Sequence, residues 1–200
     1  TLLMEKTGMP IRSMCLSGHR RYSLGSAEGA EQSLRIMEKA IELADDLGIR
    51  IIQLAGYDVY YEKGNEDTKD RFVKNLAKAV NMASAKAIVL GFETMETEFM
   101  NTVSKAMNYV KDNASPYLEV YPDIGNITNA ACLYHTDAMK DLTKGQGHIV
   151  AVHLKETVPG KFREVPFGTG HVDFEAAIKK AWDLGVRRFV TEFWYTGNPE

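Results

Sequence analysis

Segments with helical spacing of apolar residues alternate with short apolar runs along this chain. The helical period is clearest in one segment, with the apolar residues Leu34, Met37, Ile41, Ala44 and Leu47. Gly48 follows where a helix C-terminal cap belongs. The same spacing predicts a helix that contains Phe72, Leu76, Ala79 and Ala83. A further helix is expected to be capped by Thr97, with Met100, Val103, Met107 and Val110 on its inner face. A short helix is expected over 137–144, and another from an Asp173 cap to Gly185.

The short apolar runs between these helices are rich in β-branched and aromatic residues, so they are expected to be strands. The predicted strands are Ile11–Ser17, Ile49–Leu54 and four runs that end at Glu93, Asp123, His153 and Glu192. Residues 1–9 are expected to be the end of a helix. The segments 18–29, 124–136 and 155–172 are expected to be irregular.

Six strands that alternate with helices imply parallel strands joined by right-handed crossovers. An open doubly wound sheet and a closed barrel both fit this alternation. Polar residues at four consecutive strand ends would be spread along an open sheet, but they converge at the mouth of a barrel. We therefore expect one α/β domain over residues 1–200, with the fold of a (β/α)8 TIM barrel. The chain is expected to represent this barrel from its third to its eighth strand, without the first two βα units and the final helix. Its open edges predict a homo-oligomer, a dimer, unless the absent strands exist elsewhere.

Composition narrows the classes of protein that this chain can be. The 200 residues are 44% hydrophobic, with a net charge of −3, which disfavours a nucleic-acid-binding protein. No apolar run is long enough for a membrane span. Cys15 and Cys132 are the only two cysteines, so a disulfide framework is not expected and the cytoplasm is the expected location.

The four strand ends carry the residues with the clearest chemistry. Glu93, Asp123, His153 and Glu192 are separated by 30, 30 and 39 residues, about the length of one strand–helix–loop unit. Three carboxylates and an imidazole form a ligand set that suits one divalent metal ion: Mg²⁺, Mn²⁺, Co²⁺ or Zn²⁺. Each residue taken alone could equally be a helix cap or an ion-pair partner. Together they predict a metal site.

Several segments closely resemble the L-ribulose-5-phosphate/L-xylulose-5-phosphate 3-epimerases, a family of xylose-isomerase-like barrels. The similarity runs over essentially the whole chain and is carried by MCLSGHRR (14–21), IIQLAGYDVYYE (51–62), VYPDIGN (120–126), GHIVAVHLKET (147–157) and VPFGTGHVDF (165–174). The resemblance implies that the quartet binds the metal ion. It also implies that Glu93 and Glu192 move the proton at C3 of a ketopentose 5-phosphate, through an enediolate.

Contacts to the sugar phosphate are expected from residues near the predicted mouth. His19 and Arg21 follow the first strand and could contact substrate or simply be solvated. Lys155 and Glu156 follow His153 and could contact substrate, orient the imidazole, or form a surface ion pair. The glycines of FGTG (167–170) could offer N–H groups to a phosphate, and Lys161, Arg163 and Arg20 could add charge. Glu96 and Glu98 are expected to lie near a helix start rather than bind metal.

Three other functions compete with the epimerase. An endonuclease IV-like repair enzyme would need many more histidine ligands than His153 and a less acidic chain. A sugar isomerase that moves a carbonyl between C1 and C2 could use the same ligands, so the choice of an epimerase rests on the family motifs. An inactive barrel fragment would fold without turnover.

Overall fold

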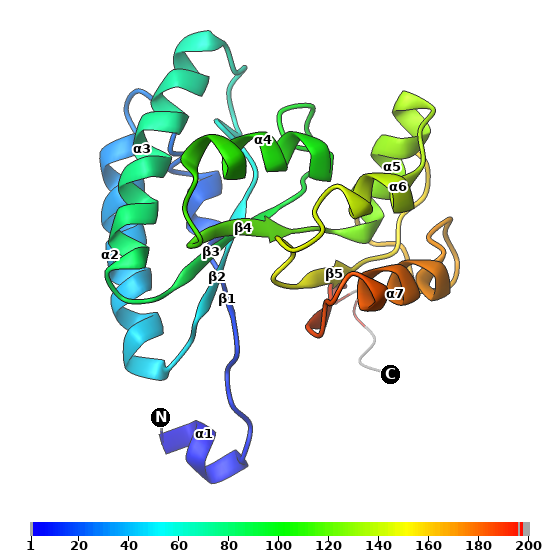
Figure 1. Ribbon diagram of the computed structural model, residues 1–200, viewed down its shortest axis with the longest axis horizontal. Helices are drawn as coiled ribbons and strands as arrows, with labels where there is room; N and C mark the ends of the chain where they lie inside the picture. Colours follow the sequence, from blue (N-terminus) through cyan, green and yellow to red (C-terminus); the bar gives the residue numbers. More distant parts are fainter. Residues whose placement is uncertain (1, 196, 198–200) are drawn as a thin grey trace. The chain divides into compact units, whose positions relative to one another are not determined.

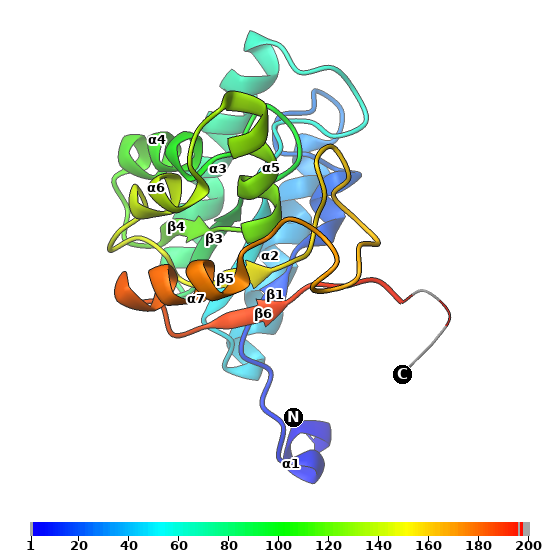
Figure 2. The same cartoon turned by 90° about the vertical axis from the view of Figure 1, so that its right-hand side faces the viewer.

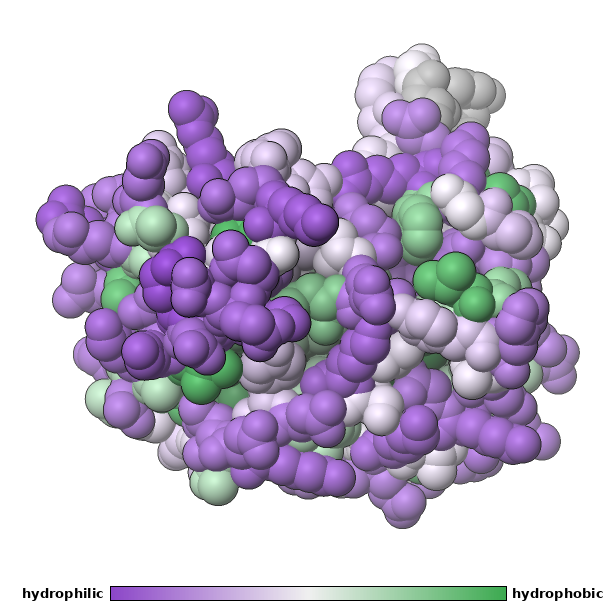
Figure 3. All heavy atoms as spheres, turned by 90° about the horizontal axis from the view of Figure 1, so that it is seen from above, coloured by the Kyte–Doolittle hydropathy of each residue, from purple (hydrophilic) through white to green (hydrophobic). Residues whose placement is uncertain are grey.

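A computed structural model describes residues 2–195 and 197, and it divides into two compact units. The first comprises Thr1–Phe92 and Tyr109–Glu119, and the second comprises Glu93–Asn108 and Val120–Glu200. The prediction that residues 1–200 form a single domain stays a prediction. None of the described helices is long and apolar enough to cross a membrane. The face seen in Figure 3 is mostly hydrophilic, with apolar side chains scattered between polar ones.

Two long helices and their strands make the core of the first unit (Figure 1). The helices α2 (Ala30–Leu47) and α3 (Glu66–Ser84) pack against each other. All four apolar residues predicted for the second helix are buried: Phe72, Leu76, Ala79 and Ala83. A capping box between Asn65 and Thr68 begins α3, and left-handed Gly48, with φ of 72°, ends α2 as predicted.

The described strands form two sheets, and the two strand pairs with a defined register are both parallel. One sheet has the order β1 (Met14–Cys15), β2 (Ile51–Ala55), β3 (Val89–Glu93) and β4 (Leu118–Tyr121), and β5 (Val152–Leu154) pairs with β6 (Phe189–Thr191). The pairs β1–β2 and β5–β6 are parallel. Parallel bridges also join Val120 to Ile149 and Asp123 to His153 in the second unit. The predicted strand Ile11–Ser17 is reduced to Met14–Cys15.

The outer helices of the second unit follow one another along the chain (Figure 2). They are α5 (Ile124–Tyr134), α6 (Ala138–Thr143) and α7 (Phe174–Asp183), and α6 contacts both of the others. Asp173 caps α7 as predicted, through the N–H of Ala176. The predicted short helix over 137–144 is confirmed as α6. At the N-terminus, α1 (Leu2–Thr7) and a short 3₁₀ helix η1 (Ser17–Arg20) complete the described elements.

The prediction that residues 124–136 are irregular is wrong, because α5 occupies most of them. The segment contains three poor helix formers, Gly125, Asn126 and Asn129, so helix propensity did not predict a helix there. All three are buried, so tertiary packing outweighs propensity here. A side chain at Gly125 would place its Cβ 2.7 Å from the Lys155 carbonyl oxygen, so the glycine is needed for close packing.

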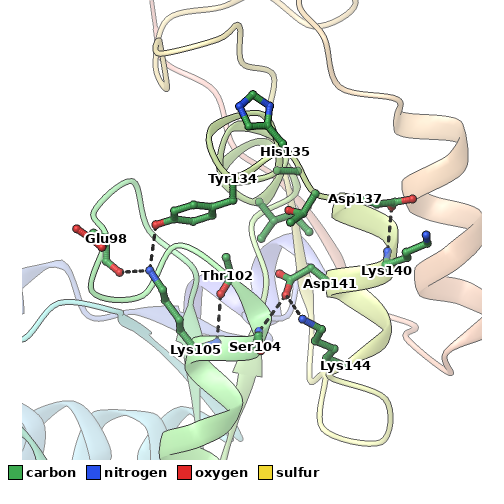
Figure 4. A pocket seen from close by; sticks show the side chains of 13 residues that line it. Glu98, Thr102, Ser104, Lys105, Tyr134, His135, Asp137, Lys140, Asp141 and Lys144 are labelled. Carbon is green, nitrogen blue, oxygen red and sulfur yellow. Dashed lines mark hydrogen bonds and ion pairs between the residues drawn. The ribbon is translucent and has the colours of Figure 1, made fainter.

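The predicted Thr97 cap is also wrong, because helix α4 (Val103–Asn113) begins later. Asp141 of α6, remote in sequence, accepts hydrogen bonds from the N–H groups of Val103 (2.7 Å) and Ser104 (3.1 Å). Figure 4 shows its carboxylate directed at Ser104, on the wall of a cavity of about 810 Å³. Met100 is buried but lies outside the helix.

Replacing Asp141 by alanine should destabilise the protein by about 1–3 kcal/mol, because two N–H groups of α4 lose a buried acceptor. Asp137→Ala is the matched control, since Asp137 caps α6 in the same way but from an exposed position. Water can replace Asp137, so that loss should be smaller. Urea unfolding followed by circular dichroism measures both. Equal losses would mean that the cross-helix cap adds nothing to an ordinary exposed cap.

Candidate metal centre

The predicted quartet converges in the second unit. One ligand atom from each of Glu93, Asp123, His153 and Glu192 can be chosen so that all four lie within 4.8 Å of one another. His153 Nδ1 lies 2.8 Å from Glu93 Oε1 and 3.1 Å from Glu192 Oε2, and 4.0 Å from Asp123 Oδ2. Ligand atoms about 2.0–2.2 Å from a shared ion would show separations of this size.

Hydrogen bonds from backbone N–H groups hold three members of the quartet in place. The His153 N–H donates to the Pro122 carbonyl, and the Glu192 N–H donates to the Leu154 carbonyl, each at 2.9 Å. The Asp123 N–H donates to the Thr94 hydroxyl at 3.0 Å. His153 and Glu192 are therefore fixed by strand pairing, and Asp123 is fixed by Thr94, the residue that follows Glu93.

Asp123 divides its two carboxylate oxygens between two tasks. Oδ1 accepts the Asn126 N–H at 2.7 Å and so caps helix α5. Oδ2 faces the cluster, where Lys155 Nζ lies 2.9 Å away. Although Asp123 Oδ2 and Glu192 Oε2 lie close to cationic or imidazole nitrogens, both are buried without a well-directed hydrogen bond. Such oxygens keep lone pairs that a bound cation could use.

The charges of the cluster call for a divalent cation. Three carboxylates face one ammonium, so two negative charges remain when His153 is neutral. Burial, with repulsion from Glu93 and Glu192, raises the pKa of Asp123 to about 7 against the attraction of Lys155. Burial would also raise the pKa of Glu192, but the close contact with the His153 imidazole and the charge of Lys155 outweigh it and lower that pKa to about 2. The residues present fit a hard or borderline divalent ion.

Lys155 and Glu156 are both buried, so the surface ion pair is excluded. Lys155 is 4% exposed and pairs with Asp123. Its Nζ also lies 4.0 Å from Glu192 Oε2. Glu156 turns the other way and accepts N–H groups of the following loop, from Thr157 (3.0 Å), Gly168 (2.9 Å) and Val172 (3.2 Å). The Gly168 N–H, expected to be open to a phosphate, is therefore already satisfied by a carboxylate.

His19, Arg20 and Arg21 lie in the first unit. His19 is buried, with Nε2 3.3 Å from the Ser33 carbonyl oxygen, and burial lowers its pKa to about 4. The guanidinium of Arg20 lies over the Tyr60 ring at 5.8 Å, and that of exposed Arg21 over the Tyr22 ring at the same distance. Glu96 lies in the loop before α4 and pairs with Arg163 at 2.9 Å.

The chain matches the family model of the xylose isomerase-like TIM barrels over residues 3–200. It is 46% identical over 194 residues to L-ribulose-5-phosphate 3-epimerase UlaE of Salmonella paratyphi A, covering 96% of this chain and 67% of the relative. The chain belongs to the L-ribulose-5-phosphate 3-epimerase family. The predicted fold, a xylose-isomerase-like α/β barrel with parallel strands, is confirmed, and the chain is homologous to carbohydrate 3-epimerases, which are isomerases.

Solved structures support the fold of this epimerase-family chain. A 3-keto-D-glucoside 4-epimerase from E. coli has a TM-score of 0.81 at 16% identity, covering 99% of this chain and 77% of that one. A xylose isomerase-like TIM barrel protein from Mycobacterium smegmatis, in complex with magnesium, has a TM-score of 0.78 at 18% identity, covering 98% of this chain and 71% of that one. In both, the likeness shows the shared fold.

Sequence reasoning missed two residues that support the epimerase-family site. Thr94 accepts the Asp123 N–H, and its carbonyl accepts the Asn126 amide at 2.7 Å. Thr94 directly follows Glu93 and Asn126 lies three residues after Asp123, and this closeness along the chain was the available signal.

The wild-type chain should bind one Mn²⁺, and Asp123→Asn should weaken binding by about 10–100-fold or more. Asparagine keeps an oxygen that can accept the Asn126 N–H, so the cap of α5 survives while the charge facing the ion is lost. Glu96→Gln is the control, because Glu96 pairs with Arg163 outside the quartet. Titration calorimetry measures both. Undiminished binding by Asp123→Asn would remove Asp123 from the metal site.

His19 predicts a pH dependence of stability. Its pKa is about 4 in the folded chain, against about 6.5 in an unfolded one, so the unfolded state takes up the proton first. The free energy of unfolding should be unaffected by His19 above pH 6.5. It should fall by up to about 3 kcal/mol as pH drops towards 4. His19→Gln should flatten this slope in urea titrations, whereas His135→Asn, at an exposed position, should not. An unchanged slope in His19→Gln would show that this histidine is not the proton acceptor.

Proposed function

We propose that this chain inverts C3 of a ketopentose 5-phosphate, converting L-xylulose 5-phosphate to L-ribulose 5-phosphate. The convergence of Glu93, Asp123, His153 and Glu192 within 4.8 Å carries this proposal. The relative from Salmonella paratyphi A, with which the chain shares 46% identity, supplies the substrate class, since its name specifies L-ribulose 5-phosphate and position 3.

Inversion at a carbinol carbon beside a ketone needs a proton removed from one face and returned to the other. Glu93 and Glu192 suit this pair of roles, because both carboxylates lie beside His153 and they reach it from different strand ends. One glutamate takes the C3 proton to give the enediolate of the substrate, and the other protonates the opposite face. The two roles exchange when the reaction runs in reverse.

Asp123 and His153 are proposed to hold the ion, together with the two glutamates. A bound divalent ion supplies electrostatic stabilisation of the charge that develops on the substrate oxygens. Mg²⁺, Mn²⁺, Co²⁺ and Zn²⁺ all suit these donors. The buried ammonium of Lys155, 2.9 Å from Asp123, adds positive potential to the same space.

Recognition of the phosphate end is proposed to rest on side-chain cations rather than on the glycines of residues 167–170. A phosphate there would meet the Glu156 carboxylate, which already accepts the Gly168 N–H. His19, Arg21 and Lys155 stay proposed substrate contacts, whereas Glu156 is proposed to hold the loop that follows it, because its carboxylate already accepts three N–H groups there. A homodimer in the cytoplasm is the proposed setting. The two free cysteines are compatible with a reducing compartment.

Glu93→Gln and Glu192→Gln should each lower C3 proton exchange with D₂O by about 10²–10⁴-fold, because each removes one proton-transfer group. Nuclear magnetic resonance of the ketopentose 5-phosphate measures exchange at each carbon, and Glu175→Gln, on the exposed side of α7, is the control. Near-normal exchange in either variant would contradict the two-glutamate mechanism. If deuterium entered at C1 and not at C3, the chain would be the related sugar isomerase.

A further inference from the structure

Cys132, His171 and Thr157 form a hydrogen-bonded series in the second unit, outside the metal centre. Cys132 Sγ, on α5, lies 3.8 Å from His171 Nδ1, and His171 Nε2 lies 2.9 Å from the Thr157 hydroxyl. The Thr157 hydroxyl donates to the Gly125 carbonyl at 3.2 Å. Since that hydroxyl proton is used, its oxygen accepts from His171 Nε2–H. This arrangement selects the tautomer whose Nδ1 lone pair faces the thiol.

The imidazole is held firmly in this position. The His171 N–H donates to the Thr157 carbonyl at 3.0 Å, so both the backbone and the ring of His171 are tied to the same residue. Gly170, just before it, packs so closely that a Cβ would lie 2.1 Å from that carbonyl oxygen. Thr157 itself is fully buried. A fixed base beside an exposed thiol is the arrangement that activates cysteine nucleophiles.

Space and a recognition group adjoin the thiol. Cys132 and His171 both line a cavity of about 520 Å³, and Cys132 also lines one of about 310 Å³ together with Asn129. Asn129 is 5% exposed, and its Oδ1 accepts the Gly160 N–H at 2.8 Å. Its Nδ2 is buried without a partner. A buried amide donor of this kind needs an acceptor oxygen, which a carbonyl or carboxylate of a bound molecule would provide.

We propose that Cys132 is a thiol-modification site that takes low-molecular-weight disulfides carrying carbonyl or carboxylate groups. His171 Nδ1 removes the thiol proton, and Sγ attacks one sulfur of the disulfide. The disulfide bond breaks as the Cys132–sulfur bond forms, and the other half leaves as a thiol that recovers the proton from His171. Cys132 is oxidised and the leaving half is reduced, so no other oxidant is needed.

The second cysteine of the chain gives an internal comparison. Cys15 is also free and exposed, but it lies in the first unit and is not among the contacts of His171 described above. Incubation of the whole chain with glutathione disulfide at pH 7, followed by peptide mass spectrometry, gives a separate rate for each thiol. Cys132 should react about ten-fold faster than Cys15, since only a few per cent of an ordinary thiol is ionised at this pH.

His171→Gln should lower the Cys132 rate about five- to ten-fold and leave the Cys15 rate unchanged, and circular dichroism checks that the variant is folded. At about pH 10, where ordinary thiols are ionised, the wild-type and variant rates should converge. Equal rates for Cys132 and Cys15 at pH 7, or a His171→Gln effect that persists at pH 10, would overturn the proposal in favour of simple accessibility.

Asn129→Asp separates recognition from activation. The aspartate keeps an oxygen for the Gly160 N–H but removes the unpartnered donor. It should slow modification by glutathione disulfide about three-fold or more, while bis(2-hydroxyethyl) disulfide, which has no carbonyl, reacts as with the wild type. Equal slowing of both probes would overturn the assignment of Asn129 as the recognition group.

Discussion

The fold of the second unit depends on keeping three carboxylates together with one ammonium and one imidazole. Taking several like charges out of water costs free energy unless partners of opposite charge lie close by. Lys155 is that partner here, at 2.9 Å from Asp123. The raised pKa of Asp123, at about 7, shows that one ammonium is not enough to compensate the burial of the group. A divalent cation would remove the remaining imbalance, so the residues that create the charge imbalance are the same ones that could hold a metal ion.

Asp123 links this electrostatic constraint to the backbone. One of its oxygens caps α5 and the other faces the cluster, so the helix start and the ligand geometry cannot vary independently. Gly125 lets the helix approach the Lys155 carbonyl, and the ammonium of the same lysine pairs with Asp123. Close packing of α5 and charge compensation at Asp123 therefore support each other.

The convergence of Glu93, Asp123, His153 and Glu192 could be predicted because each ends a short apolar run, and the interval between runs is one strand–helix unit. Helices with regular apolar spacing, such as the one containing Phe72 and Leu76, were predictable for the same reason. Helix α5 was not, because its buried face includes Gly125 and asparagines that bond to residues far away in sequence. The start of α4 was equally hidden, since its cap comes from Asp141, which follows it by more than thirty residues.

Lys155 and Glu156 show how adjacent charged residues reach two different surroundings. Along an extended backbone, side chains alternate, so His153 and Lys155 face one side and Glu156 faces the other. His153 and Lys155 both reach the cluster, and Glu156 instead gathers the N–H groups of the loop that follows. Had this alternation been applied to the residues after His153, it would have placed Lys155 in the candidate metal centre and Glu156 outside it. The polarity of both residues alone could not distinguish them, because a buried charge is recognised by its partners and not by its type.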